Sequence, residues 1–467
     1  MASNSDKTAP LSHSGSFSDL KELLKTSGTL TDETPTFPYA VKARIHSLCS
    51  DFLGGRWKTI SIDDVQLHRM SGGMSNLLFL CELPRSIQSN FQGQPNKVLL
   101  RIYFNPETES HLVAESVIFT LLSERKLGPK LFGIFNGGRL EEYIESRPLS
   151  VYEMREPAIS RAIARCVAGI HCLSVPISKE PTYICSAMDR WLSHLLETVG
   201  DISPVTVSSK DVQSGVRGNV AGISGSATGK SRTLDAMEFR REIETIRSCL
   251  QQSTSPVIFC HNDLQAGNVL LSKPRSLFGH RCSDASMSRE VKLLLIDFEY
   301  ASYNYRAFDF ANHFCEWTID YSSKTLPCFE VRPNDFPTQE QQASFCREYL
   351  KQYLKHGKSS TDVDNNGDLS ENQVEPLVTE LVDEIQPFIA VSHFFWGIWA
   401  LLQVEMSPIH FGFKEYSQAR LAMYFETKKD MLSLLKQRVQ DHNGNVSSVE
   451  NIANGNTTDY TKSMFDI

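Results

Sequence analysis

The sequence predicts an α+β protein with two lobes: a small N-terminal lobe rich in β-strands and a large, mostly helical C-terminal lobe. Short alternations of apolar and polar residues, typical of strands, crowd the first third of the chain, whereas spacings typical of helices dominate after about residue 150. The chain has 467 residues, enough for two lobes, and its 41% hydrophobic and 22% charged residues are typical of a globular protein.

The N-terminal lobe is predicted to span residues 38–145, after a disordered tail over residues 1–37 that is rich in Ser, Thr and charge. Gly128-Pro129 is expected to end a helix, and Gly137-Gly138 to provide a hairpin turn. The expected elements, in chain order, are a helix over 40–53, strands over 65–69, 76–83 and 97–104, a helix over 107–126, and a hairpin of strands over 131–136 and 140–144.

The C-terminal lobe is predicted to span residues 146–438, before a disordered tail over residues 439–467. Residues 204–234 are rich in Ser, Gly and Val without periodicity, which predicts a mobile insertion. The apolar run 388–404 falls short of the ~20 residues needed to span a bilayer, so we expect a buried core helix and no stable membrane insertion. The expected helices lie over 152–173, 183–199, 235–252 and 338–356, and residues 374–437 are expected to be helical with a turn before Tyr416.

The most informative motif follows two apolar runs of the C-terminal lobe. Its residues are His261-Asn262-Asp263, Asn268 five positions after the aspartate, and Asp297-Phe298-Glu299 after the second run. Protein kinases use H-R-D-x-x-x-x-N followed by D-F-G for phosphoryl transfer from ATP. The spacing here is the same, with Asn in place of Arg and Glu in place of Gly, and it predicts an ATP-dependent phosphotransferase.

Three residues of this motif are our candidate catalytic residues. Asp263 is expected to act as the base that orients the attacking hydroxyl and accepts its proton. Asn268 and Asp297 are expected to coordinate Mg²⁺, which prefers oxygen ligands and keeps several waters. Gln265 lies close enough to the base to contact a phosphate or a metal-bound water, and His261 is expected to hold the loop through hydrogen bonds.

The strand over 97–104 supplies the candidate grip on the ATP phosphates. Arg101 ends an apolar run and occupies the place where protein kinases carry a lysine. Glu115, on the next helix, is expected to orient Arg101 through an ion pair. The loop before the second strand could wrap phosphates with backbone N–H groups, although it is not G-x-G-x-x-G. It comprises Ser71, Gly72, Gly73, Met74, Ser75 and Asn76.

The acceptor side is marked by aromatic residues. Trp396 and Trp399 are three residues apart and face the same side of one predicted helix, and Tyr416 follows after a turn. Such a stripe is usually core, but a quaternary ammonium cannot donate hydrogen bonds and is recognised by aromatic faces with a nearby carboxylate. Glu316 and Tyr321 could complete a cage of this kind.

The chain resembles the choline/ethanolamine kinase family over roughly residues 40–430. The motifs that carry the resemblance are specific. They are Phe259-Cys-His-Asn-Asp-Leu-Gln-Ala-Gly-Asn268, Ile296-Asp-Phe-Glu-Tyr-Ala-Ser-Tyr-Asn-Tyr-Arg306, Phe308-Asp-Phe-Ala-Asn-His-Phe-Cys-Glu-Trp317 and His393-Phe-Phe-Trp-Gly-Ile-Trp399.

The resemblance implies a bilobal protein-kinase-like fold with ATP between the lobes and choline as the acceptor. It supports Asp263 as the base, Asn268 and Asp297 as magnesium ligands, and Arg101 and Gln265 as phosphate contacts. It places the adenine against a linker that includes Glu142, Tyr143, Ile144 and Arg147. It also implies a choline pocket built from Tyr300, Glu316, Tyr321, Trp396, Trp399 and Tyr416.

The resemblance further implies a homodimer and the first step of the CDP-choline route to phosphatidylcholine. A net charge of −8 argues against nucleic acid as a partner, and eleven scattered cysteines without a C-x-x-C pair fit reduced thiols in the cytoplasm. Two alternatives stay open: an ethanolamine or dual-specificity kinase, and a catalytically inactive scaffold.

Overall fold

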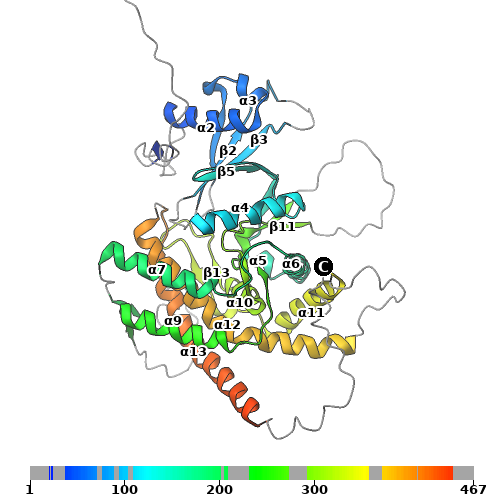
Figure 1. The fold of residues 1–467 in the computed structure, drawn as a ribbon, viewed down its shortest axis with the longest axis vertical. Helices are drawn as coiled ribbons and strands as arrows, with labels where there is room; N and C mark the ends of the chain where they lie inside the picture. The colour runs from blue at the N-terminus through cyan, green and yellow to red at the C-terminus, as the bar shows by residue number, and fades with distance from the viewer. Residues whose placement is uncertain are drawn as a thin grey trace, which may run out of the picture.

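The computed structural model has two lobes that stack along the long axis of the molecule (Figure 1). It describes residues 20, 23–24, 37–70, 76–88, 94–103, 109–200, 204–208, 231–272, 292–356, 371–407 and 409–444. The N-terminal lobe is built on an antiparallel sheet and the C-terminal lobe is mostly helical, so the predicted bilobal α+β fold is confirmed.

Five antiparallel strands form the sheet of the N-terminal lobe, in the order β1-β2-β3-β5-β4. Its core includes Phe79 and Leu100, which are fully buried on neighbouring strands. The predicted hairpin is present, with Gly137 in the left-handed region at φ 91°. The elements are α2 (Tyr39–Leu53), α3 (Arg56–Thr59), β1 (Gln66–Met70), β2 (Asn76–Glu82), β3 (Lys97–Tyr103), α4 (Glu109–Glu124), β4 (Leu131–Phe135) and β5 (Gly138–Glu142).

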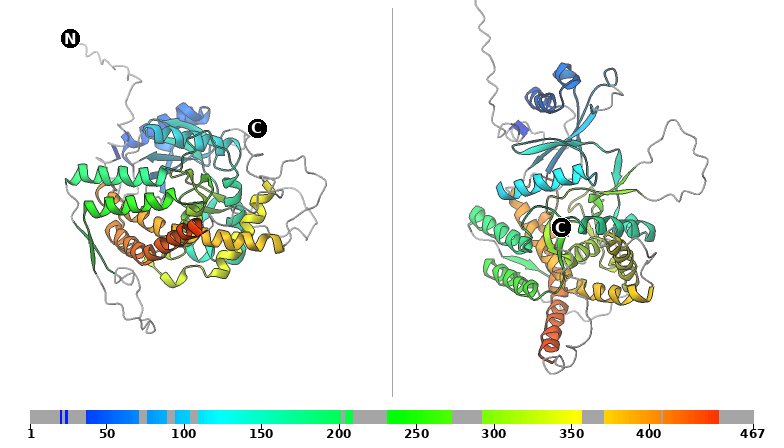
Figure 2. Two further views of the ribbon diagram at one scale, coloured as in Figure 1. Left: turned by 60° about the horizontal axis from the view of Figure 1, so that its bottom comes forward. Right: turned by 45° about the vertical axis from the view of Figure 1, so that its right-hand side comes forward.

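Helices dominate the C-terminal lobe, and short strand pairs lie among them. Helices α7 and α9 run side by side at one edge of the lobe (Figure 2). The helices are α5 (Val151–Met154), α6 (Pro157–His171), α7 (Tyr183–Val199), α9 (Ala236–Gln251), α10 (Arg306–Glu316), α11 (Gln339–His356), α12 (Glu371–Met406) and α13 (Phe413–Gly444). The strands are β6 (Ser146–Pro148), β7 (Val205–Val207), β8 (Arg232–Leu234), β9 (Val257–Cys260), β10 (Val269–Ser272), β11 (Leu293–Leu295), β12 (Ser302–Tyr305), β13 (Ile319–Asp320) and β14 (Glu330–Val331).

One long helix of the prediction is divided in the structure, and the turn expected before Tyr416 is present. The expected helix over 152–173 becomes α5 and α6, because Pro157 is well suited to begin a new helix. The helical region over 374–437, with a turn before Tyr416, is present as α12 and α13, which pack against each other after the chain reverses between Met406 and Phe413.

The predicted insertion and tails are described only in part. The ends of the insertion, residues 205–207 and 232–234, pair as the antiparallel strands β7 and β8, which we had not expected. Leu20 and Leu24, within the predicted N-terminal tail, are buried in the core of the N-terminal lobe. Helix α13 continues to Gly444, beyond the expected end of the lobe. The predictions for residues 1–19, 71–75, 209–230 and 445–467 lie outside the described residues.

Helix α12 carries the apolar run that could be mistaken for a membrane span. Residues Gln373–Met406 are long and apolar enough to cross a bilayer, but 83% of the most apolar part is buried inside the molecule. It contacts α7, α10, α11 and α13, so the prediction of a core helix is confirmed.

Candidate active site

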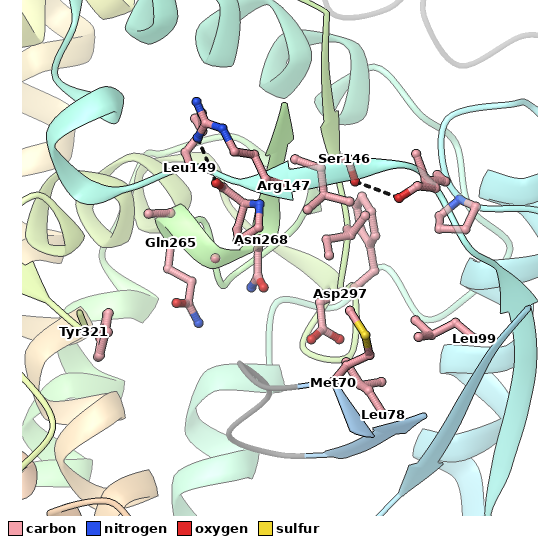
Figure 3. A pocket seen from close by; sticks show the side chains of 18 of the residues that line it. Met70, Leu78, Leu99, Ser146, Arg147, Leu149, Gln265, Asn268, Asp297 and Tyr321 are labelled. Carbon is pink, nitrogen blue, oxygen red and sulfur yellow. Dashed lines mark hydrogen bonds between the residues drawn. The ribbon is translucent and has the colours of Figure 1, made fainter. Parts of the chain in front are cut away.

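A cleft of about 660 Å³ lies where the two lobes meet. The N-terminal lobe contributes Met70, Leu78 and Leu99, which give one wall an apolar surface. Gln265, Asn268 and Asp297 line it from the C-terminal lobe (Figure 3). One apolar wall and one wall of oxygen and amide groups suit a ligand with an aromatic base at one end and phosphates at the other.

The linker between the lobes forms the back of this cleft. Strand β5 belongs to the sheet of the N-terminal lobe, whereas β6 pairs with β10 of the C-terminal lobe, so residues 143–145 cross between them. The predicted adenine-contacting residues Glu142, Tyr143, Ile144 and Arg147 all line the cleft. Arg147 also forms a two-pronged ion pair with Glu153, at 2.8 and 2.6 Å.

The loop that follows β9 is held in an uncommon backbone conformation. Asn262 has a φ of 67°, a region that Asn tolerates better than most residues. Its side chain donates to the carbonyl of Tyr300 at 2.8 Å and accepts from Asn304 Nδ2 at 2.8 Å. The Asn that replaces the kinase Arg therefore has a local reason: it fixes the turn that directs the next residue, Asp263.

A buried carboxylate on α10 holds the same loop through backbone hydrogen bonds. Asp309 accepts hydrogen bonds from the backbone N–H groups of His261 at 2.8 Å and Asn262 at 2.5 Å. It also accepts from His171 Nε2 at 2.9 Å, whose other ring nitrogen lies 3.0 Å from the hydroxyl of Tyr349. His171, Cys260 and Asp309 lie close enough to suggest a metal site, but these bonds already account for the imidazole and the carboxylate.

Two of the three predicted catalytic residues, Asn268 and Asp297, line the cleft, and Asp263 lies beside them. Asn268 Nδ2 donates to the carboxylate of Asp263 at 2.7 Å, and this leaves the amide Oδ1 as the candidate metal ligand. Burial, followed by the negative charges of Glu316 and Asp297, raises the pKa of Asp263 to about 8. Asp263 is thus within electrostatic reach of both the metal side and the acceptor side.

Asp297 is the carboxylate that faces the nucleotide cleft. Its φ of 65° is rare for a residue other than glycine, and such strain often accompanies function. Arg101 Nη1 donates to its Oδ1 at 2.8 Å. His261 Nε2 lies 2.9 Å from the carbonyl oxygen of Ile296, the residue before Asp297. Burial lowers the pKa of the His261 imidazole. His261 therefore links the two loops as a neutral ring, in the role that we expected.

The predicted ion pair between Arg101 and Glu115 is wrong. Glu115 pairs instead with Arg139 on β5, at 2.5 Å. Antiparallel pairing places Arg139 directly across from Arg101, and Arg139 lies between Arg101 and the helix that carries Glu115. Arg101 pairs with Glu141 at 3.5 Å and with Asp297. Sequence spacing identified Glu115 and Arg101 as charged residues of the site. It could not predict which residues of β3 and β5 lie opposite each other.

The phosphate-wrapping loop is described only at its end. Ser71, Gly72, Gly73, Met74 and Ser75 lie outside the described residues. Asn76 begins β2 and donates to Glu299 Oε2 at 2.7 Å. This bond connects the start of β2 to the segment that carries Asp297, across the two lobes.

The predicted acceptor residues gather behind Asp263 as one aromatic cluster. Tyr300 and Trp396 meet edge to face with ring centroids 5.2 Å apart, and Trp396 and Trp399 meet in the same way at 5.4 Å. The hydroxyls of Tyr321 and Tyr416 lie 3.0 Å apart. Tyr321 lines the cleft, and the other aromatic side chains are buried beside it.

The carboxylate of this cluster already has a cationic partner. Glu316 is ion-paired with Arg420 of α13, a fully buried side chain that also donates to Tyr416 and His393. Tyr321 donates to the other carboxylate oxygen of Glu316 at 3.0 Å. We expected an anionic cage, but Arg420 balances the charge of Glu316, so aromatic faces remain the main feature that a cation would meet.

Comparison with known proteins decides the family. The family model described as choline/ethanolamine kinase matches residues 67–425. The chain belongs to the choline/ethanolamine kinase family. Choline kinase A2 of Caenorhabditis elegans is 46% identical over 433 residues, which cover 90% of this chain and 93% of the relative. The human choline/ethanolamine kinase is 38% identical over 393 residues, which cover 84% of this chain and 87% of the human chain.

Solved structures support the kinase fold independently. The crystal structure of choline kinase from Cryptosporidium parvum matches with a TM-score of 0.58 at 21% identity, covering 84% of this chain and 96% of the other. Membership of this family makes the chain an ATP-using kinase whose acceptor is choline, ethanolamine or both.

Sequence reasoning missed four residues of this kinase's site. Asp309 lies within the quoted motif Phe308-Asp-Phe, so its position signalled importance without revealing a role. Arg420, Arg139 and Glu141 carried no recognisable spacing. Arg420 lies within an apolar helix pattern. An arginine in such a pattern needs a buried partner, and this is the one signal that could have prompted a search for it.

Proposed function

We propose that this protein phosphorylates choline with Mg²⁺·ATP to give phosphocholine. The observation that carries the proposal is the aromatic cluster of Tyr300, Trp396 and Trp399. The backbone carbonyl of Tyr300 accepts a hydrogen bond from Asn262, the residue before Asp263, which keeps this cluster close to the proposed base. A trimethylammonium group spreads its charge over methyl surfaces and is stabilised by aromatic faces. The Glu316 charge, balanced by Arg420, would add only a weak attraction of its own.

In this proposal Asp263 positions the choline hydroxyl and accepts its proton as the bond to phosphorus forms. Asn268 and Asp297 hold magnesium, for which an amide oxygen and a carboxylate on one wall of the cleft are a fitting donor set. Bound magnesium would neutralise charge on the ATP phosphates. Arg101 and Gln265 contact those phosphates, and the linker from Glu142 to Arg147 receives the adenine.

A methylation series of acceptors tests the choice of substrate most directly. We would measure kcat/KM for ethanolamine, its N-methyl and N,N-dimethyl derivatives, and choline at saturating Mg²⁺·ATP. Recognition by aromatic faces predicts a rise with each methyl group, because each replaces an N–H donor that seeks an oxygen acceptor. A maximum at ethanolamine would overturn the choline assignment while leaving the kinase intact.

A dual-specificity or ethanolamine kinase is the second candidate function, and Tyr321 and Glu316 favour it in part. The Tyr321 hydroxyl and the Glu316 carboxylate could accept hydrogen bonds from a primary ammonium. The inactive-scaffold alternative is disfavoured, because Asp263, Asn268 and Asp297 are all present and lie together. Lack of turnover with all four acceptors would restore it.

The remaining expectations are proposals of the same kind. Phosphocholine production would be the first step of the CDP-choline route to phosphatidylcholine. The ten cysteines in the described residues are free thiols, which supports the cytoplasm as the location. A homodimer is expected from the family, and sedimentation of the purified chain at several concentrations would test it.

A further inference from the structure

A chain of buried charges connects helix α4 to the candidate metal ligand Asp297. Glu115 of α4 pairs with Arg139 at 2.5 Å, and Arg139 Nε donates to Glu141 Oε2 at 2.7 Å. The other oxygen of Glu141 lies 3.5 Å from Arg101 Nη2, and Arg101 Nη1 donates to Asp297 at 2.8 Å. Protein kinases connect the corresponding helix to the phosphate grip through one direct Lys–Glu pair. Here two further side chains intervene.

We propose that Arg139 and Glu141 are positioning residues that transmit the placement of helix α4 to Arg101, and thereby set the affinity for Mg²⁺·ATP. This inference rests on the proposed role of Arg101 as the phosphate contact. It goes beyond that role by assigning a function to Arg139 and Glu141, which lie at the inner wall of the cleft and are almost fully buried.

We call the chain of buried charges from Glu115 to Asp297 the relay. The strand register explains why it must pass through Glu141. Arg101 and Arg139 are direct cross-strand partners, and Glu141 lies two residues further along the same strand, on the same face. Two guanidinium groups side by side repel each other unless a carboxylate lies between them. Glu141 supplies one oxygen to each arginine, so displacing Arg139 would leave Glu141 free to draw Arg101 away from Asp297.

Burial makes these contacts obligatory. The exposed fraction is 2% for Arg139, 2% for Glu141 and 3% for Arg101. Buried charges of this kind cannot be satisfied by water and must keep their partners. Arg139 is further fixed by the Phe119 ring of α4, whose centroid lies 4.0 Å from its guanidinium carbon. Helix α4 and β5 are therefore coupled by both charge and packing.

The charge balance of the relay favours a cation at its open end. Two guanidinium groups face three carboxylates, from Glu115, Glu141 and Asp297. The side chain of Asp297 is 19% exposed, whereas those of both arginines are at most 4% exposed. The excess negative charge thus lies at the cleft, and the more firmly Arg101 is held, the better defined is the site that Mg²⁺·ATP meets.

The test is binding of a non-hydrolysable ATP analogue with Mg²⁺, measured by calorimetry on the full chain. Arg139→Lys keeps the charge but loses the two-directional fork, and we expect its Kd to rise about tenfold. Glu115→Gln should raise the Kd in the same way. The double variant should be much less impaired than the product of the single effects, because both changes break one chain.

The decisive comparison uses Arg101→Met as a background. Adding Arg139→Lys to Arg101→Met should change the Kd by less than about twofold, since the relay then has no end to act on. Arg306→Lys is the matched control: it alters an ion pair with Glu384, at 2.5 and 3.2 Å, in the other lobe. It should leave the Kd unchanged.

Three results would overturn the inference: an unchanged Kd in Arg139→Lys, the same penalty with and without Arg101, or an equal rise in the KM for choline together with a lower Tm. Failure of the proposed function would look different. Wild-type protein would then turn over neither choline nor ethanolamine, while the coupling between positions 115, 139 and 101 in analogue binding could still be measured.

Discussion

Two buried charge clusters, one in each lobe, use the same chemistry to opposite ends. The cluster of the N-terminal lobe runs through Arg139, Glu141 and Arg101 and opens at Asp297 onto the cleft. The cluster of the C-terminal lobe closes on itself, because Arg420 satisfies Glu316 and also bonds Tyr416 and His393. In the proposed function, the first cluster would present charge to phosphates and metal. The second hides its charge and would leave aromatic faces for a bulky cation.

Under the proposed function, this difference would let one fold handle two ligands of opposite sign close to Asp263. Asp263 lies between the clusters, and both Glu316 and Asp297 contribute to its raised pKa. A highly charged nucleotide needs exposed counter-charge, whereas a quaternary ammonium gains little from a carboxylate that it cannot hydrogen-bond. Substitutions in each cluster should therefore affect the two ligands differently.

Replacing Asp263, which lies between the two clusters, should be the most damaging change. Asp263→Asn keeps the shape but removes the base, and kcat should fall by about 10³-fold. Binding of Mg²⁺ with an ATP analogue, measured by calorimetry, should stay within about twofold of wild type. Turnover close to that of the wild type would remove Asp263 from its proposed role.

Breaking the aromatic face should affect the acceptor alone. Trp399→Leu should raise the KM for choline by about 30-fold, while Trp399→Phe, which keeps a ring, should raise it much less. Trp191, buried against Phe395 in the same lobe, is the matched control, and Trp191→Leu should leave this KM unchanged. Equal effects of Leu and Phe at position 399 would argue for packing rather than cation recognition.

The pH profile should report the base directly. Because burial and two carboxylates raise the pKa of Asp263 to about 8, the group is protonated and inactive as a base below that pH. We expect kcat/KM for choline to rise about tenfold between pH 7 and pH 9. The apparent pKa of kcat should be lower, because bound cations favour the ionised carboxylate. A flat profile over this range would contradict the assignment.

Loosening the closed cluster should give the smallest effect. Arg420→Lys keeps a positive charge beside Glu316 but cannot span Tyr416 and His393 as well. The KM for choline should rise about fivefold with the KM for ATP unchanged. Arg306→Lys serves again as the control for loss of an arginine fork. An equal rise in both KM values would indicate general loosening of the lobe.

The sequence predicted the parts of the site that lie along one stretch of chain. Asp263 and Asn268 are joined by a short loop between two apolar strands, so their spacing limits where each can point. The same holds for Trp396 and Trp399, whose contact follows from three-residue spacing on a helix. The hairpin at Gly137, the core helix α12 and the two-lobed division were likewise readable from local patterns.

The choice of partner among distant charged residues was decided only by the tertiary structure. Glu115 pairs with Arg139 rather than Arg101 because of the register between β3 and β5, and Arg420 reaches Glu316 because α13 packs against α12. A long charged side chain can pair with any opposite charge brought within reach, and local spacing does not encode which one arrives. Local motifs therefore predicted the family and its candidate catalytic residues, whereas packing between distant elements set which charges pair.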